Sequence, residues 1–434
     1  VQLFGNGLHP FGNHISPILL LLTPFYWIWP DPRMILCVQN IVIAAGVIPL
    51  YWLSRDHIKS PVAGVVICFA YLLYPALQLS AATEFHESHL ITTPFLFTFY
   101  FLQKRAYGKF IVFGLLTLMC KEDVALLIGM CGLYAIYRHR DYMLGSGVIL
   151  FSGIWLFIGV FVVMPMYELG GSWYLQFFNE ISVNEEAVTA VDSSGLDSIW
   201  NELMQVSNIT FLLQLLVPLG ALAVLAPIEL MVVVPTIFLF FVYTGPPFGM
   251  VGTIYTWHVM AVIPTLFIAT IFGIKHVITR MGGPSLVPCL FIIIGCTILS
   301  NMLYGVLPFA LRYDFSDFRI SEHDRTGHTL LEQVPPVVSV STTSQLAAHL
   351  TNRERIYALP QPWEKSGWRA PMANFPNEVE FVFADTSYSV IQEMDAVQRE
   401  EFLEFVRGIG RDPTYATVTA LDGYVIYRQK KSAP

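Results

Sequence analysis

The sequence predicts a polytopic α-helical membrane protein with a small α/β domain at its C-terminal end. Hydrophobic residues make up 55% of the 434 residues, charged residues only 13%, and the mean hydropathy is +0.57. A soluble domain could not bury that much apolar surface. The apolar residues form runs of bilayer length, whereas the chain after about Val334 is polar and patterned like short strands and helices. The formal charge of -8 argues against a nucleic-acid partner.

Eight uninterrupted apolar runs predict membrane-crossing helices. They cover residues 34–53, 62–79, 89–102, 144–164, 211–226, 230–242, 257–274 and 286–311. A further run, from Phe110 to Tyr137, is interrupted by charged residues. The segment 14–32 is hydrophobic but short, bounded by prolines and rich in aromatic residues. For this segment we expect a helix lying at the outer membrane interface, with a full transmembrane span as the alternative.

Four short loops rich in Lys and Arg predict the orientation of the chain. They cover residues 54–59, 103–109, 137–141 and 275–280, and the positive-inside rule makes them cytoplasmic. Alternation then places four regions outside: 84–88, 167–209, 244–255 and everything after Arg312. We therefore expect an outer juxtamembrane segment at 1–32, a transmembrane domain at 33–312 with an outer loop at 165–210, and an extracytoplasmic α/β domain at 313–434.

The polar C-terminal region predicts five strands and two helices. Strands are expected at 337–341, 355–359, 378–385, 414–420 and 424–428, and helices at 343–350 and 391–406. The pair Asp422-Gly423 between the last two strands predicts a tight hairpin. No glycine-rich phosphate loop or nucleophile elbow occurs in this region, so we expect no chemistry there.

Lys121, Glu122 and Asp123 interrupt the run 110–137 with three consecutive charges. Each would cost about 2.5–3.5 kcal/mol facing lipid, so we expect them to face protein or water. Both ends of the run are basic, so the triplet is expected at the outer tip of a short-armed hairpin, in a water-filled recess. An internal ion pair between helices is the alternative to cavity lining. Because three helical residues spread over about 200°, at least one should be a structural partner.

The outer segment 84–88 supplies a second group of polar residues. Glu84 and Glu87 are spaced i, i+3 and would share a helical face, where they could supply a base or oxygen ligands for a metal. An ordinary solvated loop is the alternative. The acidic residues of the long outer loop are expected to form a solvated face, namely Glu180, Glu185, Glu186 and Asp192.

Several stretches carry a resemblance to a known family. They are HISPILLLLTPFYWIWP, YLLYPALQ, EFHESHLITTPFLF, CKEDVAL, YTWHVMAVIP and the tail motif DGYVIYR. They resemble a family of predicted multipass membrane proteins that carries only a domain of unknown function, over nearly the whole chain. That family is similar to the GT-C glycosyltransferases, which take a sugar from a polyprenyl-phosphate carrier at the outer face of the membrane. The resemblance implies a GT-C-like fold.

The resemblance also implies roles for individual residues in the first half of the chain. His14 and Pro17 resemble the motif that opens the juxtamembrane helix after the catalytic first outer loop. Glu84, His86 and Glu87 occupy the place where many members carry an acidic residue that faces the carrier phosphate or a metal. For His14, a plain hydrogen bond at the interface is the alternative.

Later positions fit the same pattern. Lys121 resembles the lysine at the outer end of a short helix that contacts a lipid phosphate. Tyr255 and His258 resemble the polar entry to a late helix that lines the same cavity, and a helix-end hydrogen bond is the alternative for His258. One departure stands out, because such transferases usually place their catalytic acid just after the first transmembrane helix. This chain starts downstream of that position.

The leading hypothesis is a membrane glycosyltransferase that uses a polyprenyl-phosphate-linked sugar on the extracytoplasmic face. Such a donor requires cationic groups or a divalent ion for its phosphate, and a carboxylate as base. The candidate catalytic residues are Glu84, Glu87 and Asp123, and the candidate substrate-binding residues are His14, His86, Lys121, Glu122, Tyr255 and His258. No motif assigns a metal, although a divalent ion is compatible with these carboxylates.

Two other functions stay open. A noncatalytic scaffold subunit of a larger membrane complex fits a chain that begins without the usual catalytic segment. A transporter would also use intramembrane charges, but the sequence lacks a pair of matching Gly/Pro-broken helices in two halves. The expected partners are the lipid bilayer and the lipid-linked sugar, with other membrane subunits under the scaffold hypothesis.

Overall fold

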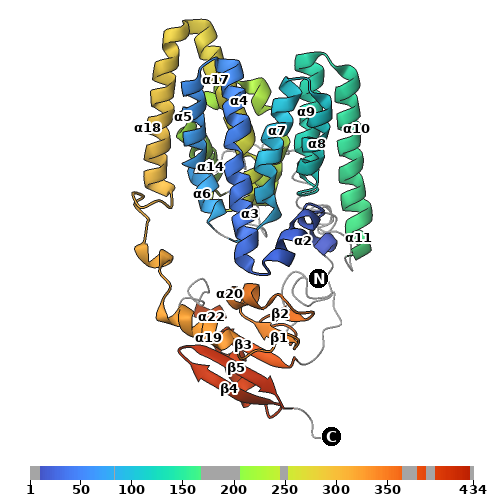
Figure 1. Cartoon of the computed structure of the whole chain (residues 1–434), viewed down its shortest axis with the longest axis vertical. Coiled ribbons are helices and arrows are strands. Elements are labelled where there is room, and N and C mark those ends of the chain that lie inside the picture. The colour runs from blue at the N-terminus through green and yellow to red at the C-terminus, as the bar shows by residue number, and fades with distance from the viewer. Residues whose placement is uncertain are drawn as a thin grey trace, which may run out of the picture.

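The structure is a computed structural model that describes residues 10–82, 84–167, 206–244, 253–363, 379–387 and 396–430. Figure 1 shows a bundle of long helices with the C-terminal domain at one end of it. A continuous core of buried aliphatic and aromatic side chains fills the bundle, with Phe95, Phe99, Phe267 and Leu50 among its fully buried members. Two further clusters belong to the C-terminal domain, so each part of the chain buries its own apolar surface.

The helical domain is built from helices of ten to nineteen residues and several single turns. The longer helices are α2 (Leu19–Ile28), α3 (Pro32–Ala45), α4 (Val47–Ile58), α5 (Pro61–Leu72), α7 (Thr92–Gln103), α8 (Tyr107–Leu118), α9 (Val124–Tyr134), α10 (Tyr142–Ile158), α14 (Val206–Leu216), α16 (Val234–Thr244), α17 (Ile263–Met281) and α18 (Leu286–Tyr304). The shorter elements used below are α1 (Pro10–Asn13), η2 (Glu87–Ile91), α6 (Pro75–Ala81), α11 (Met164–Tyr167), η6 (Leu222–Leu225), α15 (Pro227–Leu230) and η7 (Trp257–Ala261).

Local sequence explains where helices α3 and α5 begin. Asp31 caps α3 by accepting a hydrogen bond from the Arg33 amide, and Ser60 caps α5 at the Ala63 amide. Pro32 and Pro61 each occupy the first helical turn, where the missing amide proton costs nothing.

Four helical segments are long and apolar enough to cross a bilayer, within the part of the chain that the structure describes. They are Pro32–Ile58, Tyr142–Tyr167, Ile263–Met281 and Gly283–Tyr304, and the pair α5–α6, bent by 45°, makes a fifth if it is one span. The expected spans 34–53, 62–79, 144–164 and 286–311 fall on these segments. Membrane-crossing helices are thus confirmed as a feature of the chain, although in smaller number than expected.

Four expected spans need correction. The run 89–102 begins in the 3₁₀ turn η2, and its helix α7 has only twelve residues, too few for a full span. The run 211–226 is not one helix, because α14 ends at Leu216 and both Gly220 and Ala221 adopt left-handed backbone conformations before η6. The run 257–274 begins as the 3₁₀ turn η7, and its helix α17 runs on to Met281. The run 230–242 starts as a helix only at Val234. The hydrophobicity of the sequence predicted none of these breaks in the helices, because apolar residues continue across them.

The interrupted run forms the expected hairpin. Helices α8 and α9 are joined by a turn that contains Lys121, Glu122 and Asp123, while α8 packs mainly against α7 and α9 mainly against α10. The segment after His14 forms the ten-residue helix α2, which is about 15 Å long against a hydrocarbon core of about 30 Å. The alternative of a full transmembrane span is therefore wrong for this segment. Phe25 and Trp27 of this helix, and Trp29 just after it, are exposed.

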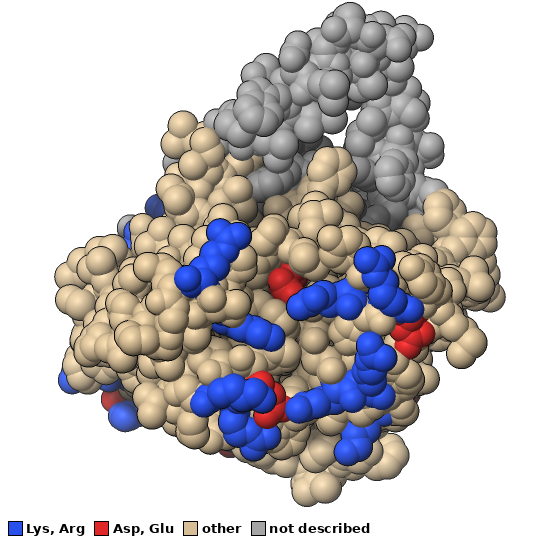
Figure 2. Space-filling view, turned by 90° about the horizontal axis from the view of Figure 1, so that it is seen from above, with Lys and Arg blue, Asp and Glu red and all other residues tan. Residues whose placement is uncertain are grey.

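The four basic loops lie together at one end of the bundle. They form the turns α4–α5, α7–α8, α9–α10 and α17–α18, at the end away from the C-terminal domain in Figure 1. Figure 2 looks onto this end and shows Lys and Arg side chains around most of it. The opposite end of the bundle faces the C-terminal domain and carries α1, α2 and the α8–α9 turn.

The C-terminal domain is a five-stranded mixed sheet with helices on both faces. Its strands are β1 (Val340–Thr342), β2 (Ile356–Ala358), β3 (Phe381–Asp385), β4 (Tyr415–Leu421) and β5 (Tyr424–Gln429), in the order β2-β1-β3-β5-β4. β1 is parallel to β2 and β3, and β5 is antiparallel to β3 and β4. All five expected strands are confirmed, and Asp422 and Gly423 form the hairpin turn with positive φ angles.

The helices of this domain differ more from expectation. α20 (Ser344–Ala347) is a single turn, and α22 (Ala396–Arg411) lies later than the expected 391–406, whose first five residues lie outside the described ones. Helix α19 (Glu322–Leu331) was not expected, although the pattern Ser321-x-x-Asp324 forms a complete capping box at its start. The domain touches the bundle through Asn352, which donates a hydrogen bond to the Pro30 carbonyl.

Candidate functional site

Glu122 connects the segment around His14 and Ile15 to the tip of the α8–α9 hairpin through hydrogen bonds. Its carboxylate lies 2.9 Å from Nδ1 of His14 and accepts the Ile15 amide proton at 2.8 Å, and its side chain is fully buried. A backbone hydrogen bond from Ile18 to the Met119 carbonyl adds a third link. Glu122 is therefore the member of the charged triplet with a structural role, and it fixes the orientation of the His14 ring.

Lys121 is the second buried charge of the triplet. Its side chain is only 6% exposed, and its Nζ lies 3.2 Å from the carboxylate of Asp123, whose side chain is 26% exposed. Lys121 therefore forms an ion pair within the turn, and its charge also acts on His86 and Glu87. Lys121 and Glu122 are buried inside the protein. Of the three charged residues, only Asp123 can face the expected water-filled recess.

His86 and Glu87 enter the same region from η2. The His86 amide donates to Oε1 of Gln39 on α3, and its ring Nδ1 lies 3.1 Å from the Ser88 hydroxyl. Glu87 places Oε2 3.5 Å from His86 Nδ1, and its Oε1 is buried with no hydrogen-bond partner in the described part of the chain. The solvated-loop alternative is therefore wrong for His86 and Glu87.

His89 and Trp257 support this segment and were not among the expected residues. His89 is buried and contacts the Ser80 hydroxyl and carbonyl as well as the His86 carbonyl, so it holds η2 in place. Trp257 stacks on the His86 ring, with centroids 4.5 Å apart and planes 17° apart. From the sequence, Trp257 is expected to face lipid or the protein core. Only the fold brings it against His86.

The charges of the cluster act on one another. Burial lowers the pKa of His86, and the charges of Lys121 and His14 lower it further. Burial likewise lowers the pKa of His258 to about 3, with Lys121 and His14 acting in the same direction. Burial raises the pKa of Glu87, against the effect of His14 and Lys121. His86 and His258 are therefore neutral imidazoles near pH 7, and Nδ1 of His86 accepts a hydrogen bond from the Ser88 amide.

Two expected site residues lie apart from this cluster. Glu84 is exposed, and no contact in the described ranges joins it to the other candidates. Tyr255 is 41% exposed and accepts a hydrogen bond from Arg312 at 2.7 Å, so it faces the chain that leads to the C-terminal domain. The expected solvated residues of the outer loop lie outside the described residues, namely Glu180, Glu185, Glu186 and Asp192.

His14, His86 and Glu87 form a group that could hold a metal ion. One nitrogen or oxygen atom from each of the three side chains lies within 4.8 Å of the other two. Two imidazoles and a carboxylate match the ligands of catalytic zinc sites, which use three protein ligands and leave one position open. The three residues come from two segments that are 72 positions apart in the sequence, so only the fold assembles them.

The family model described as Predicted membrane protein (DUF2079) matches residues 1–426. The chain belongs to this family of predicted membrane proteins. No curated protein matches it. The membrane class expected from composition is thereby confirmed, and contact with a lipid bilayer follows from it.

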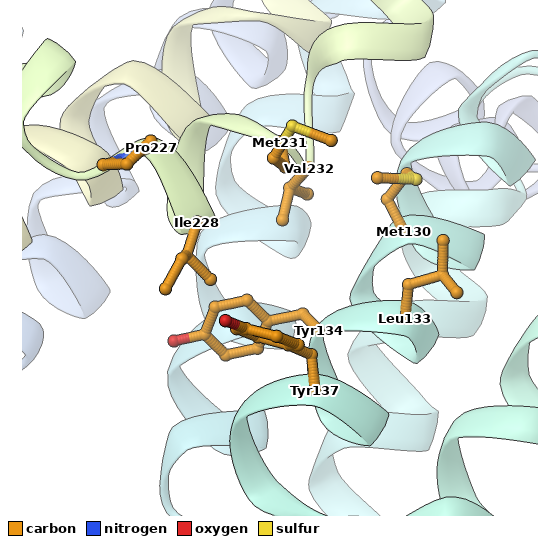
Figure 3. Close-up of a pocket in the computed structure, with 8 residues that line it drawn as sticks. All are labelled: Met130, Leu133, Tyr134, Tyr137, Pro227, Ile228, Met231 and Val232. Atoms are coloured by element: carbon orange, nitrogen blue, oxygen red, sulfur yellow. The ribbon is translucent and has the colours of Figure 1, made fainter.

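A separate cavity of about 370 Å³ lies elsewhere in this DUF2079 protein. Figure 3 shows its lining between the end of α9 and the segment around α15, with the rings of Tyr134 and Tyr137 facing Ile228 and Val232. Tyr134 in the lining donates a hydrogen bond to the buried Glu229 at 3.0 Å. None of the expected site residues lines this cavity, and its walls are mostly apolar, so the candidate chemistry stays with the charged cluster.

Proposed function

We propose that this protein is a membrane transferase that takes a sugar from a polyprenyl phosphate, at the end of the helical domain that faces the C-terminal domain. The observation that carries the proposal is the convergence of Lys121, His14, His86 and Glu87 on one partly buried site. Buried charges in a membrane protein are costly and mark sites of function. A lysine together with imidazoles and carboxylates suits the recognition of a phosphorylated headgroup.

The distribution of basic loops supports an extracytoplasmic position for this site. The Lys- and Arg-rich turns occupy the opposite end of the bundle, and cytoplasmic loops are the ones enriched in these residues. With that orientation, the cluster and the C-terminal domain are both on the outer side. The exposed aromatic residues in and next to α2 suit the headgroup zone on that side, and Trp27 is 78% exposed.

Lys121 and Asp123 receive the two roles that the reaction requires. Lys121 contacts an oxygen of the donor phosphate and offsets its charge. Asp123 is the more accessible partner of Lys121 and accepts the proton of the acceptor hydroxyl. The hydroxyl oxygen then forms a bond to the anomeric carbon, the bond between that carbon and the phosphate oxygen breaks, and the polyprenyl phosphate leaves. Glu122 acts only by positioning His14.

The first test is binding of the carrier. Purified full-length protein should bind a polyprenyl monophosphate and bind the uncharged polyprenol at least tenfold more weakly, measured by native mass spectrometry in detergent. Lys121→Ala should remove this preference for the phosphate. Lys104→Ala is the matched control, because Lys104 also pairs with an aspartate, Asp56, but lies at the basic end of the bundle.

The second test is transfer of the sugar. Lys121→Ala and His86→Ala should abolish transfer from a polyprenyl-phosphate sugar in membrane vesicles while the proteins remain folded in the membrane. Full activity in both variants would refute the site. Carrier binding without transfer by the wild-type protein, together with copurification in a larger assembly, would instead support the noncatalytic subunit.

A further inference from the structure

The cavity between α9 and α15 lies beside the break in the helical chain. The chain turns at Gly220 and Ala221, and α15 that follows is a single helical turn that packs against α17. The side of α9 that bears Tyr134 and Tyr137 therefore faces a cavity of about 370 Å³ instead of a neighbouring helix (Figure 3). This volume lies within the range of ligand pockets, about 300–1,000 Å³.

The cavity is apolar and open at the side of the bundle. Leu133, Ile228 and Met231 belong to its lining and are exposed, and in a membrane protein such side chains contact lipid. Tyr137 directly precedes the basic turn, whereas Met130 lies seven residues earlier, about 10 Å further along the helix. The cavity therefore runs from the basic end toward the middle of the bilayer.

The buried hydroxyl group in this lining is already satisfied. Tyr134 donates a hydrogen bond to Glu229 at 3.0 Å and accepts one from Nε2 of Gln103 at 3.0 Å. A hydrocarbon chain could therefore fill the cavity without leaving this hydroxyl unpaired. Apolar cavities do not hold ordered water, so hydrocarbon is the occupant that the walls favour.

Arg138 places a positive charge at the end of the cavity that adjoins the basic turn. It follows Tyr137 and is exposed, and its charge acts on Glu229 beside the cavity. Lys104 at the same end of the bundle pairs with Asp56, whereas Arg138 has no hydrogen bond or ion pair within the described ranges of the chain. A guanidinium group without a carboxylate partner is well suited to a phosphate, which it can contact through two parallel hydrogen bonds.

We infer that this cavity binds one hydrocarbon chain of a phospholipid with an anionic headgroup, and that Arg138 holds the phosphate of that lipid. Basic pockets between transmembrane helices on the cytoplasmic side are typical sites for anionic lipids. The positive-inside rule explains why arginine is frequent at this end, but not why an unpaired one adjoins an apolar cavity. The inference does not depend on the proposed function, because the cavity and the cluster around Lys121 share no residue.

Lipid binding by the purified full-length protein tests this inference. Native mass spectrometry in detergent compares phosphatidylglycerol with phosphatidylcholine of identical chains, whose headgroup has no net charge. We expect one retained phosphatidylglycerol per chain and roughly tenfold weaker binding of phosphatidylcholine. Arg138→Gln should make the two lipids bind alike, and Ile228→Trp, which fills the cavity, should weaken binding of both. Equal binding of the two lipids by the wild type would overturn the inference, and so would unchanged binding by Ile228→Trp.

Two control variants separate this site from the general charge of the protein. Arg280→Gln removes another exposed arginine from the basic end, at the end of α17, and should keep the preference for phosphatidylglycerol. Loss of the preference in this variant would assign it to the net charge of the basic end and overturn the inference. Lys121→Ala should lose the polyprenyl phosphate and still retain phosphatidylglycerol, so the proposed function and this inference can fail separately.

A measurement on the wild-type chain covers the case in which the variants misfold. A phosphatidylglycerol with a diazirine in one acyl chain is added at one molecule per protein and photolysed, and the labelled peptides are identified by mass spectrometry. The label should fall on residues 130–137 or 227–232, and excess phosphatidylglycerol, but not phosphatidylcholine, should prevent it. Label spread over all exposed helices, or confined to other segments, would overturn the inference.

Discussion

The two ends of the helical domain each contain a Lys–Asp pair, in very different surroundings. At the basic end, Lys104 pairs with Asp56, and the lysine side chain is 46% exposed. At the opposite end, Lys121 pairs with Asp123, and the lysine side chain is 6% exposed. Asp56 also accepts hydrogen bonds from Tyr100 and Arg55, whereas Lys121 lies among His86, Glu87 and Glu122.

This difference separates charges that set the orientation of the chain in the membrane from charges that could bind a substrate or take part in a reaction. An exposed pair contributes at most about 1 kcal/mol and keeps most of its hydration. A buried pair costs several kcal/mol of desolvation, which only good geometry and further polar partners offset. The buried charges therefore require a functional explanation, whereas the positive-inside rule alone explains the basic loops. Four predictions test this contrast, in order of decreasing effect.

The orientation of the two ends gives an all-or-none prediction. In a background without the six native cysteines, a membrane-impermeant maleimide added to intact cells should label Val418→Cys in the C-terminal domain. The same reagent should leave Arg280→Cys in the α17–α18 turn unlabelled until the membrane is permeabilised, because basic loops are cytoplasmic. The reverse labelling pattern would put the charged cluster on the cytoplasmic side and exclude the proposed function.

Removal of the structural carboxylate should destabilise the fold. Glu122→Ala leaves the Ile15 amide and the His14 ring without their partner, and we expect a loss of about 3 kcal/mol in the free energy of unfolding. Lys104→Ala at the basic end should cost at most about 1 kcal/mol. Denaturant unfolding of both variants in the same detergent measures the difference. Equal losses would mean that burial does not distinguish the two ends.

Substitution of the buried lysine should reduce activity more than stability. We expect Lys121→Ala to abolish detectable sugar transfer, a loss of at least about 100-fold, the size of effect found when one preorganised electrostatic contact to a transition state is lost. Lys121→Arg keeps the charge and should recover part of this loss. The matched Lys104→Ala variant should transfer sugar at the wild-type rate. An equal effect of the two alanine variants in a transfer assay would remove Lys121 from the site.

The smallest effect concerns a more exposed histidine–carboxylate pair in the C-terminal domain. Burial lowers the pKa of His323, but the carboxylates of Asp385 and Asp422, at 3.1 and 3.0 Å, outweigh this and raise it. The protonated ring therefore stabilises the docking of α19 below about pH 6.5, and this contribution disappears as the pH rises through the raised pKa.

Hydrogen exchange of α19 in the full chain, corrected for intrinsic rates, measures this contribution at pH 5.5 and 8.5. Protection should fall at the higher pH by the equivalent of a few tenths to about 1 kcal/mol. The His323→Gln variant should show no such change. A wild-type protein with greater protection at pH 8.5 would contradict the sign of the effect.

Sequence patterns predicted the parts of the fold that depend on local order. The hairpin tip at 121–123 and all five strands were predictable, because charge within an apolar run and strict alternation are local signals. The break after Leu216 was not, since the residues on both sides are equally apolar. Helix α19 was missed because its outer face is polar, although its capping box was readable.

The candidate site was predictable residue by residue but not as an arrangement. His14, His86, Glu87 and Lys121 stood out as polar groups in an apolar chain. The separation of Glu84 from Glu87 was not predictable, because the i, i+3 spacing assumed a helix where η2 begins only at Glu87. The contacts of Glu122 with His14 and of Trp257 with His86 join segments more than a hundred positions apart, and no single sequence encodes such pairings visibly.

The most direct test is a cryo-electron microscopy map of the full-length protein with bound polyprenyl monophosphate. The account predicts headgroup density within hydrogen-bonding distance of Lys121 Nζ and next to His86 and Glu87, at the end that faces the C-terminal domain. Headgroup density among Arg55, Lys104 and Lys275 at the basic end, with none at Lys121, would contradict it.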